Sequence, residues 1–464
     1  MFVNREDELE ELERAWSSGR AELLVIYGRR RIGKTSLIER FCRGRSYVYL
    51  LVNFTDEARA VKDLVDQLLS QVELEFKPQV DGFRDLYSLL CKLAERRRRL
   101  ILVIDEFQRL HEAGGVTILQ EFWDRGFSKT DVMLVLMGSS VGVMEDIGLS
   151  YSSPLYGRAT KVVKLSPFKY RASRLFFKSW SPEDRVRGYA VFGGVPGYLR
   201  LVDSSRSLKE NIESLALRGN TMLREEPITM LTSELRDIDR YMAVLEAIAQ
   251  GASTLGEVAG RVGMKTSDIS KYVRVLERQL DVVERYYPLL SEERGRARYR
   301  LSDNYMAFWF RYVRPNLHLL ELGLHERVLE RVMSTIDEYT SRVFEDVALE
   351  HMATLARAGE IAFTKIGRWW RGGVEIDVVA VDEGASTAYF AECKWTSEPA
   401  SRRDLYKLVS KSEEFPWRRG RRRDVYLLYS RSGFTFSGDS EVKLYSLNDL
   451  EEHFDHHKPQ VQLD

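Results

Sequence analysis

The stretch GRRRIGKT (residues 28–35) is the feature that most constrains how this chain can fold. It follows a short apolar run, ELLVIY (residues 22–27), and it precedes SLIERF, where the apolar residues have helical spacing. A GxxxxGK[ST] pattern between a strand and a helix predicts a phosphate-binding loop. Gly28 and Gly33 allow the backbone to turn its N–H groups toward phosphate oxygens, and the following helix adds the positive end of its dipole. We therefore expect an α/β nucleotide-binding domain.

The residues of this loop divide into those with a chemical role and those that line the binding site. Lys34 is expected to reach the β- and γ-phosphates, and Thr35 is expected to give its hydroxyl group to Mg²⁺. The other residues expected to line the nucleotide are Arg29, Arg30, Arg31, Ile32 and Ser36.

A second motif, LILVIDEF (residues 100–107), predicts a buried strand that ends in two acids. Ligands of doubly wound sheets bind at the carboxyl ends of the strands. There Asp105 can hold Mg²⁺, and Glu106 can polarise the attacking water as a catalytic residue. A further apolar run, VMLVLMGSS (residues 132–140), ends in Ser139 and Ser140, which places Ser139 to sense the γ-phosphate. Two acids that cap a strand are often only solvated, but the preceding loop favours the catalytic interpretation.

Arg158 lies in SPLYGRAT (residues 153–160), directly before the apolar run KVVKLSPF (residues 161–168). An arginine in such a loop could stabilise the transition-state charge on the nucleotide of a neighbouring subunit, which would make the protein a homo-oligomer. It could equally be a surface arginine. The sequence leaves open whether it acts within its own subunit or across a subunit boundary.

Five stretches, in this order, resemble the archaeal ATPase family, which are AAA-like P-loop NTPases related to the signalling STAND ATPases: FVNREDELEEL, GRRRIGKTSL, LVIDEFQRL, SPLYGR and FGGVPGYL (residues 192–199). The resemblance covers about the first 230 residues and implies ATP as the nucleotide. It places Arg5 near the adenine and assigns the GGVP loop to a helical lid that reports on the nucleotide. Many AAA ATPases carry a polar amide where this chain has Ser139 and Ser140, so the sensing role departs from the family pattern.

Residues 238–303 have the pattern of a winged helix-turn-helix. DRYMAVLEAIAQG, TLGEVAGRVG and KTSDISKYVRVLERQL predict three helices, and DVVERYY and ARYRLSD predict two strands around a basic turn. The third helix of such folds enters the major groove in DNA-binding examples, so DNA is an expected partner. The same fold often serves only for packing or protein contacts. The residues expected to face phosphates are Lys265, Lys271, Arg274 and Arg278.

From about residue 339 the predicted elements follow the order αβββαβ, which is that of restriction-endonuclease-like folds. Glu345 falls on the first helix, Asp377 in one strand, and Glu392 and Lys394 in the next. Strand periodicity puts Glu392 and Lys394 on one face and Cys393 on the other. We expect the three carboxylates to bind Mg²⁺ or Mn²⁺, and Lys394 to orient the attacking water or to steady the phosphate charge as a catalytic residue.

The stretch WWRGGVEIDVVA, followed by AECKW, resembles the PD-(D/E)xK nuclease superfamily. A C-terminal domain of this kind recurs among archaeal ATPases, so the two resemblances together cover the whole chain. Trp369, Trp370 and the basic run WRRGRRR (residues 417–423) would then give the site a stacking surface and a basic rim. The alternative is an inert relic that is kept for contact with DNA or protein.

Composition limits the remaining functions. The formal net charge is zero, so no overall field attracts nucleic acid. No apolar run approaches the roughly 20 residues of a membrane helix, and the N-terminus has no apolar signal region, so we expect a cytoplasmic protein without a membrane partner. Three scattered cysteines argue against a disulfide framework.

The predicted fold class is α/β, in five parts. These are a P-loop ATPase core (1–170), a helical lid (171–237), a winged helix-turn-helix (238–303), a helical connector (304–338) and a restriction-endonuclease-like domain (339–464). We predict an ATP-binding and ATP-hydrolysing switch coupled to a C-terminal domain that binds or cleaves DNA with a metal ion. Two alternatives remain: a signalling or scaffold ATPase, and a DNA-binding regulator with a catalytically inert C-terminal domain.

Overall fold

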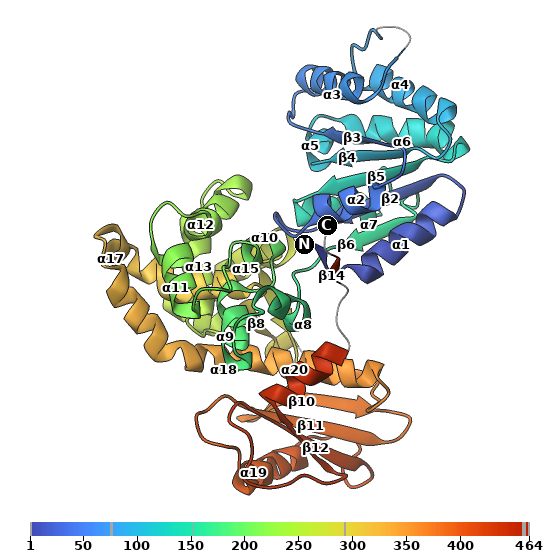
Figure 1. Cartoon of the computed structure of the whole chain (residues 1–464). Helices are drawn as coiled ribbons and strands as arrows, with labels where there is room; N and C mark the ends of the chain where they lie inside the picture. The colour runs from blue at the N-terminus through green and yellow to red at the C-terminus, as the bar shows by residue number, and fades with distance from the viewer. Residues whose placement is uncertain (1, 75–77, 152, 292–293, 457–460, 463–464) are drawn as a thin grey trace. The chain divides into compact units, whose positions relative to one another are not determined.

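The structure, a computed structural model, describes residues 2–462 except 75–77, 152, 292–293 and 457–460. The described chain forms two compact units (Figure 1). The first contains the residues up to Ser166, the short segment Arg278–Asp281 and the C-terminal strand. The second contains Pro167–Glu277 and the segment that begins at Val282.

The first unit is built around a five-stranded parallel sheet with the strand order β3–β4–β5–β2–β6. Its inner strands are almost wholly apolar because helices cover a parallel sheet on both faces. Four of the five strands coincide with the apolar runs predicted from the sequence, and β3 was not predicted. The strands are β2 (Glu22–Tyr27), β3 (Tyr47–Leu51), β4 (Ile101–Asp105), β5 (Met133–Gly138) and β6 (Lys161–Lys164).

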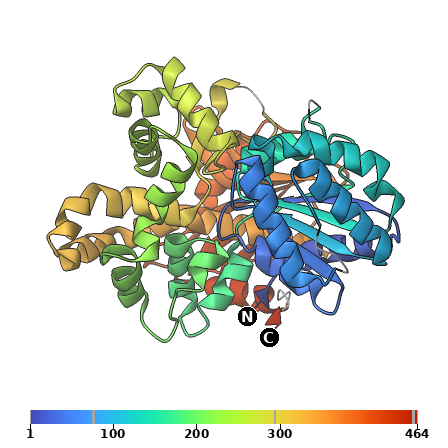
Figure 2. The same cartoon turned by 90° about the horizontal axis from the view of Figure 1, so that it is seen from above.

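Helices connect these strands, and α3, α4 and α6 share one apolar core with a face of the sheet. The short strands β1 (Phe2–Val3) and β14 (Val461–Gln462) pair antiparallel, so the two ends of the chain lie side by side (Figure 2). The helices of this unit include α1 (Glu6–Ser17), α2 (Lys34–Cys42), α3 (Glu57–Gln71), α4 (Phe83–Arg96), α5 (Gln108–Glu112), α6 (Gly115–Arg125) and α7 (Val141–Leu149).

The second unit begins with a group of helices that contains the GGVP loop. The N–H of Phe168 donates to the carbonyl oxygen of Gly194 at 2.7 Å. A Cβ on Gly194 would lie 1.8 Å from the carbonyl oxygen of Phe168, so only glycine fits in this close approach. The helices are α8 (Tyr170–Ser173), α9 (Pro182–Phe192), α10 (Pro196–Leu199), α11 (Leu208–Ile212) and α12 (Met222–Glu234).

Three helices and an antiparallel hairpin follow, in the order expected of residues 238–303. The second helix begins with a capping box between Thr254 and Glu257 and ends at Gly263, whose φ is 73°. The elements are α13 (Asp239–Ala249), α14 (Leu255–Val262), α15 (Thr266–Arg278), β7 (Val283–Tyr286) and β8 (Arg298–Leu301). After α16 (Asn304–Phe308) and α17 (Leu317–Glu321), the helix α18 (His325–Arg357) runs without interruption across the boundary expected between residues 338 and 339.

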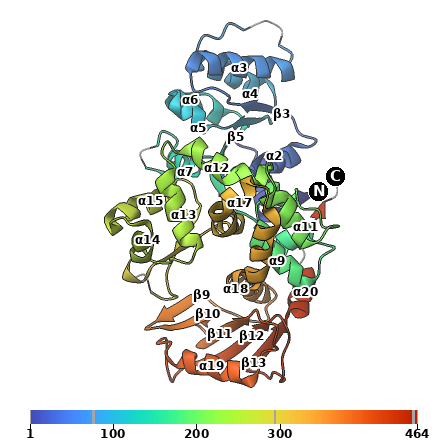
Figure 3. The same cartoon turned by 90° about the vertical axis from the view of Figure 1, so that its left-hand side faces the viewer.

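The C-terminal sheet has the strand order β13–β12–β11–β10–β9. Strands β11, β12 and β13 run parallel, and β9 and β10 are antiparallel to their neighbours. Helices α18 and α20 lie on one face of the sheet and α19 lies on the other (Figure 3). The predicted order αβββαβ is present, and β13 and α20 extend it. The elements are β9 (Lys365–Arg371), β10 (Val374–Asp382), β11 (Thr387–Lys394), α19 (Arg402–Glu413), β12 (Arg423–Ser430), β13 (Val442–Ser446) and α20 (Leu447–His456).

Among the described residues, no helix is both long enough and apolar enough to cross a membrane.

Candidate functional site

The phosphate-binding loop connects β2 to α2 through left-handed backbone conformations. Gly28, Arg31 and Gly33 have φ angles of 155°, 63° and 96°. A Cβ on Gly28 would lie 2.4 Å from the carbonyl oxygen of Leu165, so this position requires glycine. Arg29 and Ile32 are buried, whereas the remaining predicted loop residues are exposed: Arg30, Arg31, Thr35 and Ser36.

Lys34 is the first residue of α2, and its side chain is buried against the loop. Its Nζ donates to the carbonyl oxygens of Gly28 at 2.8 Å and Arg29 at 3.2 Å. Burial lowers the pKa of Lys34, and the acids Glu106 and Asp105 act in the opposite direction. The ammonium group is therefore held inside the loop, where a charged phosphate oxygen would be a stronger acceptor than a neutral carbonyl.

The two expected Mg²⁺ ligands share one neighbour, Tyr49 of β3. The Tyr49 hydroxyl donates to Oδ2 of Asp105, and the side chain of Thr35 also hydrogen-bonds to Tyr49. Oδ1 of Asp105 accepts the N–H of Glu106 at 2.8 Å. Burial and the Asp105 carboxylate raise the pKa of Tyr49, so the hydroxyl keeps its proton and remains a donor. The structure thus brings Thr35 and Asp105 together.

Glu106 follows β4 in a left-handed conformation, with φ of 54°. Its Oε2 accepts the hydroxyl of Ser139 at 3.1 Å and an N–H of the Gln108 side-chain amide. The same amide nitrogen lies 3.4 Å from Oγ of Ser139. Ser139 is therefore a direct partner of Glu106.

Arg5 ties the start of the chain to the phosphate-binding loop. Its Nη2 donates to the carbonyl oxygens of Ile32 at 3.1 Å and Ser166 at 2.8 Å. Its Nη1 donates to Oε1 of Glu8 at 2.8 Å. Its expected place near the adenine stays a prediction.

Arg158 is held by Asp124 of α6. Its Nε and Nη2 donate to the two carboxylate oxygens at 2.8 and 2.7 Å, and its Nη1 donates to the carbonyl oxygen of Pro154 at 3.1 Å. The hydrogen bonds to Asp124 raise the pKa of Arg158 and lower that of Asp124. A role on the nucleotide, in either subunit, stays a prediction.

Two of the three expected metal ligands, Glu345 of α18 and Asp377 of β10, have partners on the strands β9 and β11. Oε2 of Glu345 accepts Nε of Arg368 at 3.0 Å, and Oδ2 of Asp377 accepts the N–H of Cys393 at 2.8 Å. Burial raises the pKa of Glu345 to about 8 and that of Asp377 to about 6. Asp377 adds to the increase at Glu345, and Glu392 adds to the increase at Asp377, so Asp377 is repelled by a carboxylate on either side.

Glu392, the third expected ligand, lies between two lysines. Its Oε1 accepts Nζ of Lys394 at 2.9 Å, and its Oε2 accepts Nζ of Lys411 at 2.8 Å. Glu392 and Lys394 therefore share a face of β11, as predicted. The Lys394 side chain is 24% exposed, and its ammonium group is held by Glu392.

The predicted convergence of Glu345, Asp377 and Glu392 on one ion is not found in this structure. Within the described ranges, no three His, Cys, Asp or Glu side chains are arranged to hold a metal ion. The physical reason is that cations of the chain itself stand beside the carboxylates: Arg368, Lys394 and Lys411.

The prediction that Trp369 and Trp370 form an aromatic stacking surface is also wrong, because both side chains are buried. Trp369 is packed in the apolar core, edge-on to Phe415. Trp370 is buried under the hairpin, where Arg298 lies 4.4 Å above its ring. Of the basic run, the Arg422 side chain is 3% exposed and ion-paired with Asp424, so this arginine cannot form part of a basic rim.

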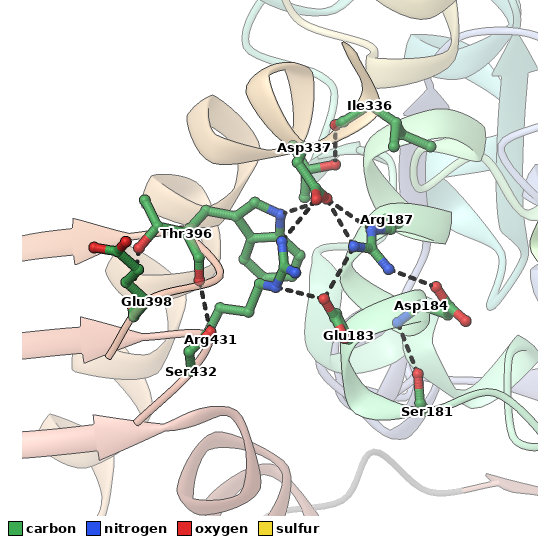
Figure 4. A network of polar contacts seen from close by, with 12 residues as sticks. Ser181, Glu183, Asp184, Arg187, Ile336, Asp337, Thr396, Glu398, Arg431 and Ser432 are labelled. Atoms are coloured by element: carbon green, nitrogen blue, oxygen red, sulfur yellow. Dashed lines mark hydrogen bonds and ion pairs between the residues drawn. The ribbon is translucent and has the colours of Figure 1, made fainter. Parts of the chain in front are cut away.

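A polar network joins α9 and α18 to the ends of strands β11 and β12 of the C-terminal sheet (Figure 4). Asp337 of α18 accepts Nε of Arg187 at 2.8 Å, Nε1 of Trp395 at 3.1 Å and Nη1 of Arg431 at 2.7 Å. Glu183 of α9 binds the same two arginines. The ends of β11 and β12 are thereby fixed to α18 and to α9, the helix that precedes the GGVP loop.

Sequence patterns did not identify three residues of these sites: Tyr49, Gln108 and Arg368. Tyr49 and Arg368 contact residues that are distant in sequence, so only the fold reveals these contacts. For Gln108 a weak signal existed, since it follows the paired acids by two positions and begins α5.

The parallel sheet, the glycine-containing loop with its buried lysine, and the acids at the end of β4 define a P-loop nucleotide-binding protein. Residues 2–202 match a family described as an ATPase domain predominantly from Archaea. Residues 309–407 match a family described as "Archaea bacterial proteins of unknown function".

Relatives extend this match along most of the chain. An uncharacterized protein of Methanocaldococcus jannaschii is 34% identical over 400 residues, which are 85% of this chain and 88% of that protein. An uncharacterized ATP-binding protein of the same organism is 56% identical over 45 residues, 10% of this chain and 76% of its own length. The chain therefore belongs to the archaeal ATPase family. The Walker-type ATPase PABY2304 of Pyrococcus abyssi has a similar fold, with a TM-score of 0.51 and 21% identity over 67% of this chain and 96% of that one.

Proposed function

We propose that this ATPase is a Mg²⁺-ATP-hydrolysing switch whose second unit binds DNA. The observation that carries the hydrolytic part is the buried Lys34 ammonium, which faces Asp105 and Glu106 at the carboxyl end of β4. Lys34 would bind the β- and γ-phosphates. Thr35 and Asp105 offer the hydroxyl and carboxylate oxygens that Mg²⁺ prefers, and the ion would neutralise phosphate charge when bound.

Glu106 is the proposed general base. Its carboxylate would accept a proton from the water that attacks the γ-phosphate, while its hydrogen bonds keep it in one orientation. Arg5 supports the site from behind, because it holds the carbonyl of Ile32 inside the loop.

Two substitutions test this assignment. Lys34→Ala is expected to lose ATP binding, because it removes the charge that faces the phosphates. Glu106→Gln is expected to keep ATP binding and to lower kcat about a hundredfold, because the amide is not a base. Nucleotide titration and steady-state phosphate release separate the two effects. Wild-type turnover in both variants would contradict the assignment.

The proposal that DNA is the partner rests on the three helices and hairpin of residues 239–301. Lys265, Lys271 and Arg274 are exposed on or next to α15, and only Lys271 has a carboxylate partner among the described residues, Asp268 at 3.2 Å. Binding should weaken with salt, and replacing both Lys265 and Arg274 with alanine should weaken it and reduce its salt dependence. Equal binding by wild type and double variant would favour the scaffold ATPase instead.

A second candidate function is metal-dependent DNA cleavage by the C-terminal sheet. It is favoured by Asp377, Glu392 and Lys394, which share one region of β10 and β11, but it requires the cations now beside the carboxylates to move. Incubation of plasmid with Mg²⁺ or Mn²⁺, with and without ATP, tests it directly. Cleavage by wild type that is lost in Asp377→Ala, with ATP turnover retained, would support a nuclease. Intact plasmid under all conditions would favour a binding module.

A further inference from the structure

Gln108 is a buried side chain in the ATP site that no sequence motif had assigned. It begins α5 and is only 8% exposed. Its amide nitrogen donates to Oε2 of Glu106, and Ser139 donates to the same oxygen at 3.1 Å. One oxygen of Glu106 therefore has two donors, one from the turn after β4 and one from the end of β5.

The other oxygen of Glu106, Oε1, accepts no hydrogen bond from the described residues. The backbone of Glu106 is fixed as well, because its N–H donates to Asp105 at 2.8 Å and the next N–H, of Phe107, donates to Met137 at 2.8 Å. A φ of 54° is unfavourable for a non-glycine residue, so this conformation persists only because its surroundings enforce it. Glu106 is thus fixed at its backbone and at Oε2, and Oε1 is left available.

The orientation of the Gln108 amide has a cost of its own. Its Oε1 is buried without a hydrogen-bond donor among the described residues. A buried acceptor without a donor destabilises the folded protein, because it has lost its hydrogen bonds to water. The reversed amide would place Oε1 against Oε2 of Glu106, and a carboxylate cannot donate to it. Buried polar atoms normally have hydrogen-bond partners, and residues that lack one without a structural benefit are expected at functional sites.

We propose that Gln108 is a positioning residue for ATP hydrolysis, which with Ser139 fixes Oε2 of Glu106 so that Oε1 receives the proton of the attacking water. The water oxygen bonds to the γ-phosphorus while the bond from this phosphorus to the β–γ bridging oxygen breaks. ADP leaves, and Glu106 returns the proton to the released phosphate or to solvent. The inference rests on the proposed function, in which Glu106 is the base.

The first test replaces Gln108 by an apolar residue of similar length. Gln108→Met removes the donor and also removes the buried acceptor. We expect kcat to fall about tenfold or more, the Kd for ATP to stay within about twofold, and Tm to stay equal or to rise. Gln108→Glu should lower kcat further, because it adds a negative charge beside Glu106. Gln120→Met on α6 is the matched control, and it should change none of these values. A fall in Tm with unchanged kcat would overturn the proposal.

The second test separates positioning from a structural role. In a Glu106→Gln background there is no base to position, so adding Gln108→Met should lower kcat no further. A structural defect would multiply the two losses, and this outcome would overturn the role of Gln108 while leaving Glu106 as the base. Full turnover by Glu106→Gln alone would overturn the proposed function and this inference with it.

Discussion

Arg158 and Asp124 form an exposed ion pair, with side chains 28% and 45% exposed. Because solvent and salt screen such a pair, separating it costs roughly 1 kcal/mol or less. If Arg158 acts on a nucleotide, it must first leave Asp124, and the carboxylate then competes with phosphate oxygens for the guanidinium group.

This competition gives opposite effects for the two partners. Arg158→Ala is expected to lower kcat several-fold with little change in the Kd for ATP, because the lost charge acts only in the transition state. Asp124→Asn is expected to raise kcat, because it releases the guanidinium group. Arg125→Ala, which removes a neighbouring arginine paired with Glu121, is the control and should be neutral. Steady-state turnover checks all three. An unchanged kcat in both Arg158→Ala and Asp124→Asn would leave Arg158 as a surface arginine.

A mixture of variants tests whether Arg158 acts across a subunit boundary. Arg158→Ala and Glu106→Gln proteins each lack one part of the site, so a mixed assembly would contain interfaces with both parts intact. We expect some turnover to return when the two proteins are mixed. No recovery in mixtures that co-assemble would mean that Arg158 acts within its own subunit or not at all.

The sequence supports prediction of single residues where one short segment contains the whole function. Gly28 to Thr35 share one loop, and Asp105 and Glu106 end one strand, so their proximity follows from local order. Tyr49 contacts Asp105 from another strand, and strand order is not encoded in any local pattern. Gln108 lies close to Glu106 in sequence, but the turn that points its amide at the carboxylate is seen only in the fold. The prediction that Glu345 binds a metal ion failed for a different reason. The fold places the cationic side chain of Arg368 beside the Glu345 carboxylate, and no local sequence pattern indicates this contact.

Among the elements, the hairpin β7–β8 packs on the edge strand β9 of the C-terminal sheet. The N–H of Leu289 donates to the carbonyl oxygen of Arg368 at 2.7 Å. Arg300 of β8 donates to both oxygens of Asp346 on α18, at 2.8 and 2.9 Å, and Asp346 also accepts Arg368 at 3.1 Å. An exposed edge strand invites pairing with other chains, and here the hairpin covers it.

Arg300→Met is expected to loosen this contact. The variant keeps the length of the side chain but leaves Asp346 with one arginine, so the second unit should lose about 1 kcal/mol of stability after allowance for solvent screening. Hydrogen exchange should accelerate together in Val283–Tyr286 and Lys365–Arg371. Arg285→Met, on the same hairpin but paired with Glu277, should leave Lys365–Arg371 unchanged. If Lys365–Arg371 exchanges at the wild-type rate in Arg300→Met, this ion pair does not hold the hairpin.

Helices and strands could be predicted from the sequence where the pattern of apolar residues was uninterrupted. The apolar runs of β2, β4 and β5 favour strands of a parallel sheet that is covered on both faces. The single helix α18 was predicted as two parts, the end of the helical connector and the first helix of the C-terminal domain. Its residues include no glycine or proline, so no stop signal separates the two parts. The docking of the hairpin depends on Leu289 and Arg298, whose partners lie about eighty residues away.

At the scale of the whole molecule, α18 organises the second unit. It lies against the C-terminal sheet along one part of its length and carries Asp337 of the polar network along another. Because Arg187 and Arg431 both bind Asp337, α9 and the sheet are joined through one carboxylate. The carboxylates of Asp337 and Glu183 balance the two arginines. Burial acts to raise the pKa of Asp337, but the hydrogen bond from Trp395 and the two arginines lower it on balance.

Asp337→Asn should weaken this connection without changing side-chain size. The carboxylate is 42% exposed, so the expected loss of stability is only about 1 kcal/mol. The effect should be seen in two places, because amide exchange should accelerate both in Pro182–Phe192 and at the ends of β11 and β12. The control Asp184→Asn removes another carboxylate from Arg187, and its effect should stay within α9. Acceleration confined to α9 in Asp337→Asn would show that α9 and the sheet are not coupled through this residue.

The pH dependence of stability in the second unit has a specific source in Glu350 of α18. Its Oε2 accepts the N–H of Arg171 at 3.1 Å, and burial raises its pKa from 4.5 to about 7. The folded unit therefore binds this proton more tightly than the unfolded chain does. The resulting stability is complete below about pH 4.5 and is lost as the pH rises through about 7.

Glu350→Gln removes this ionisation while its amide oxygen can still accept from Arg171. Relative to wild type, the variant should gain about 1–3 kcal/mol in free energy of unfolding between pH 5 and pH 8, because only the wild type must bury a charge at the higher pH. Denaturant unfolding of both proteins at several pH values gives this difference. Glu345 and Asp377 also make stability depend on pH, but they are present in both proteins, so their contributions cancel. Glu360→Gln, at an exposed position beyond α18, should show no such trend. A difference between Glu350→Gln and wild type that does not change with pH would mean that Glu350 is already ionised in the folded unit at pH 5.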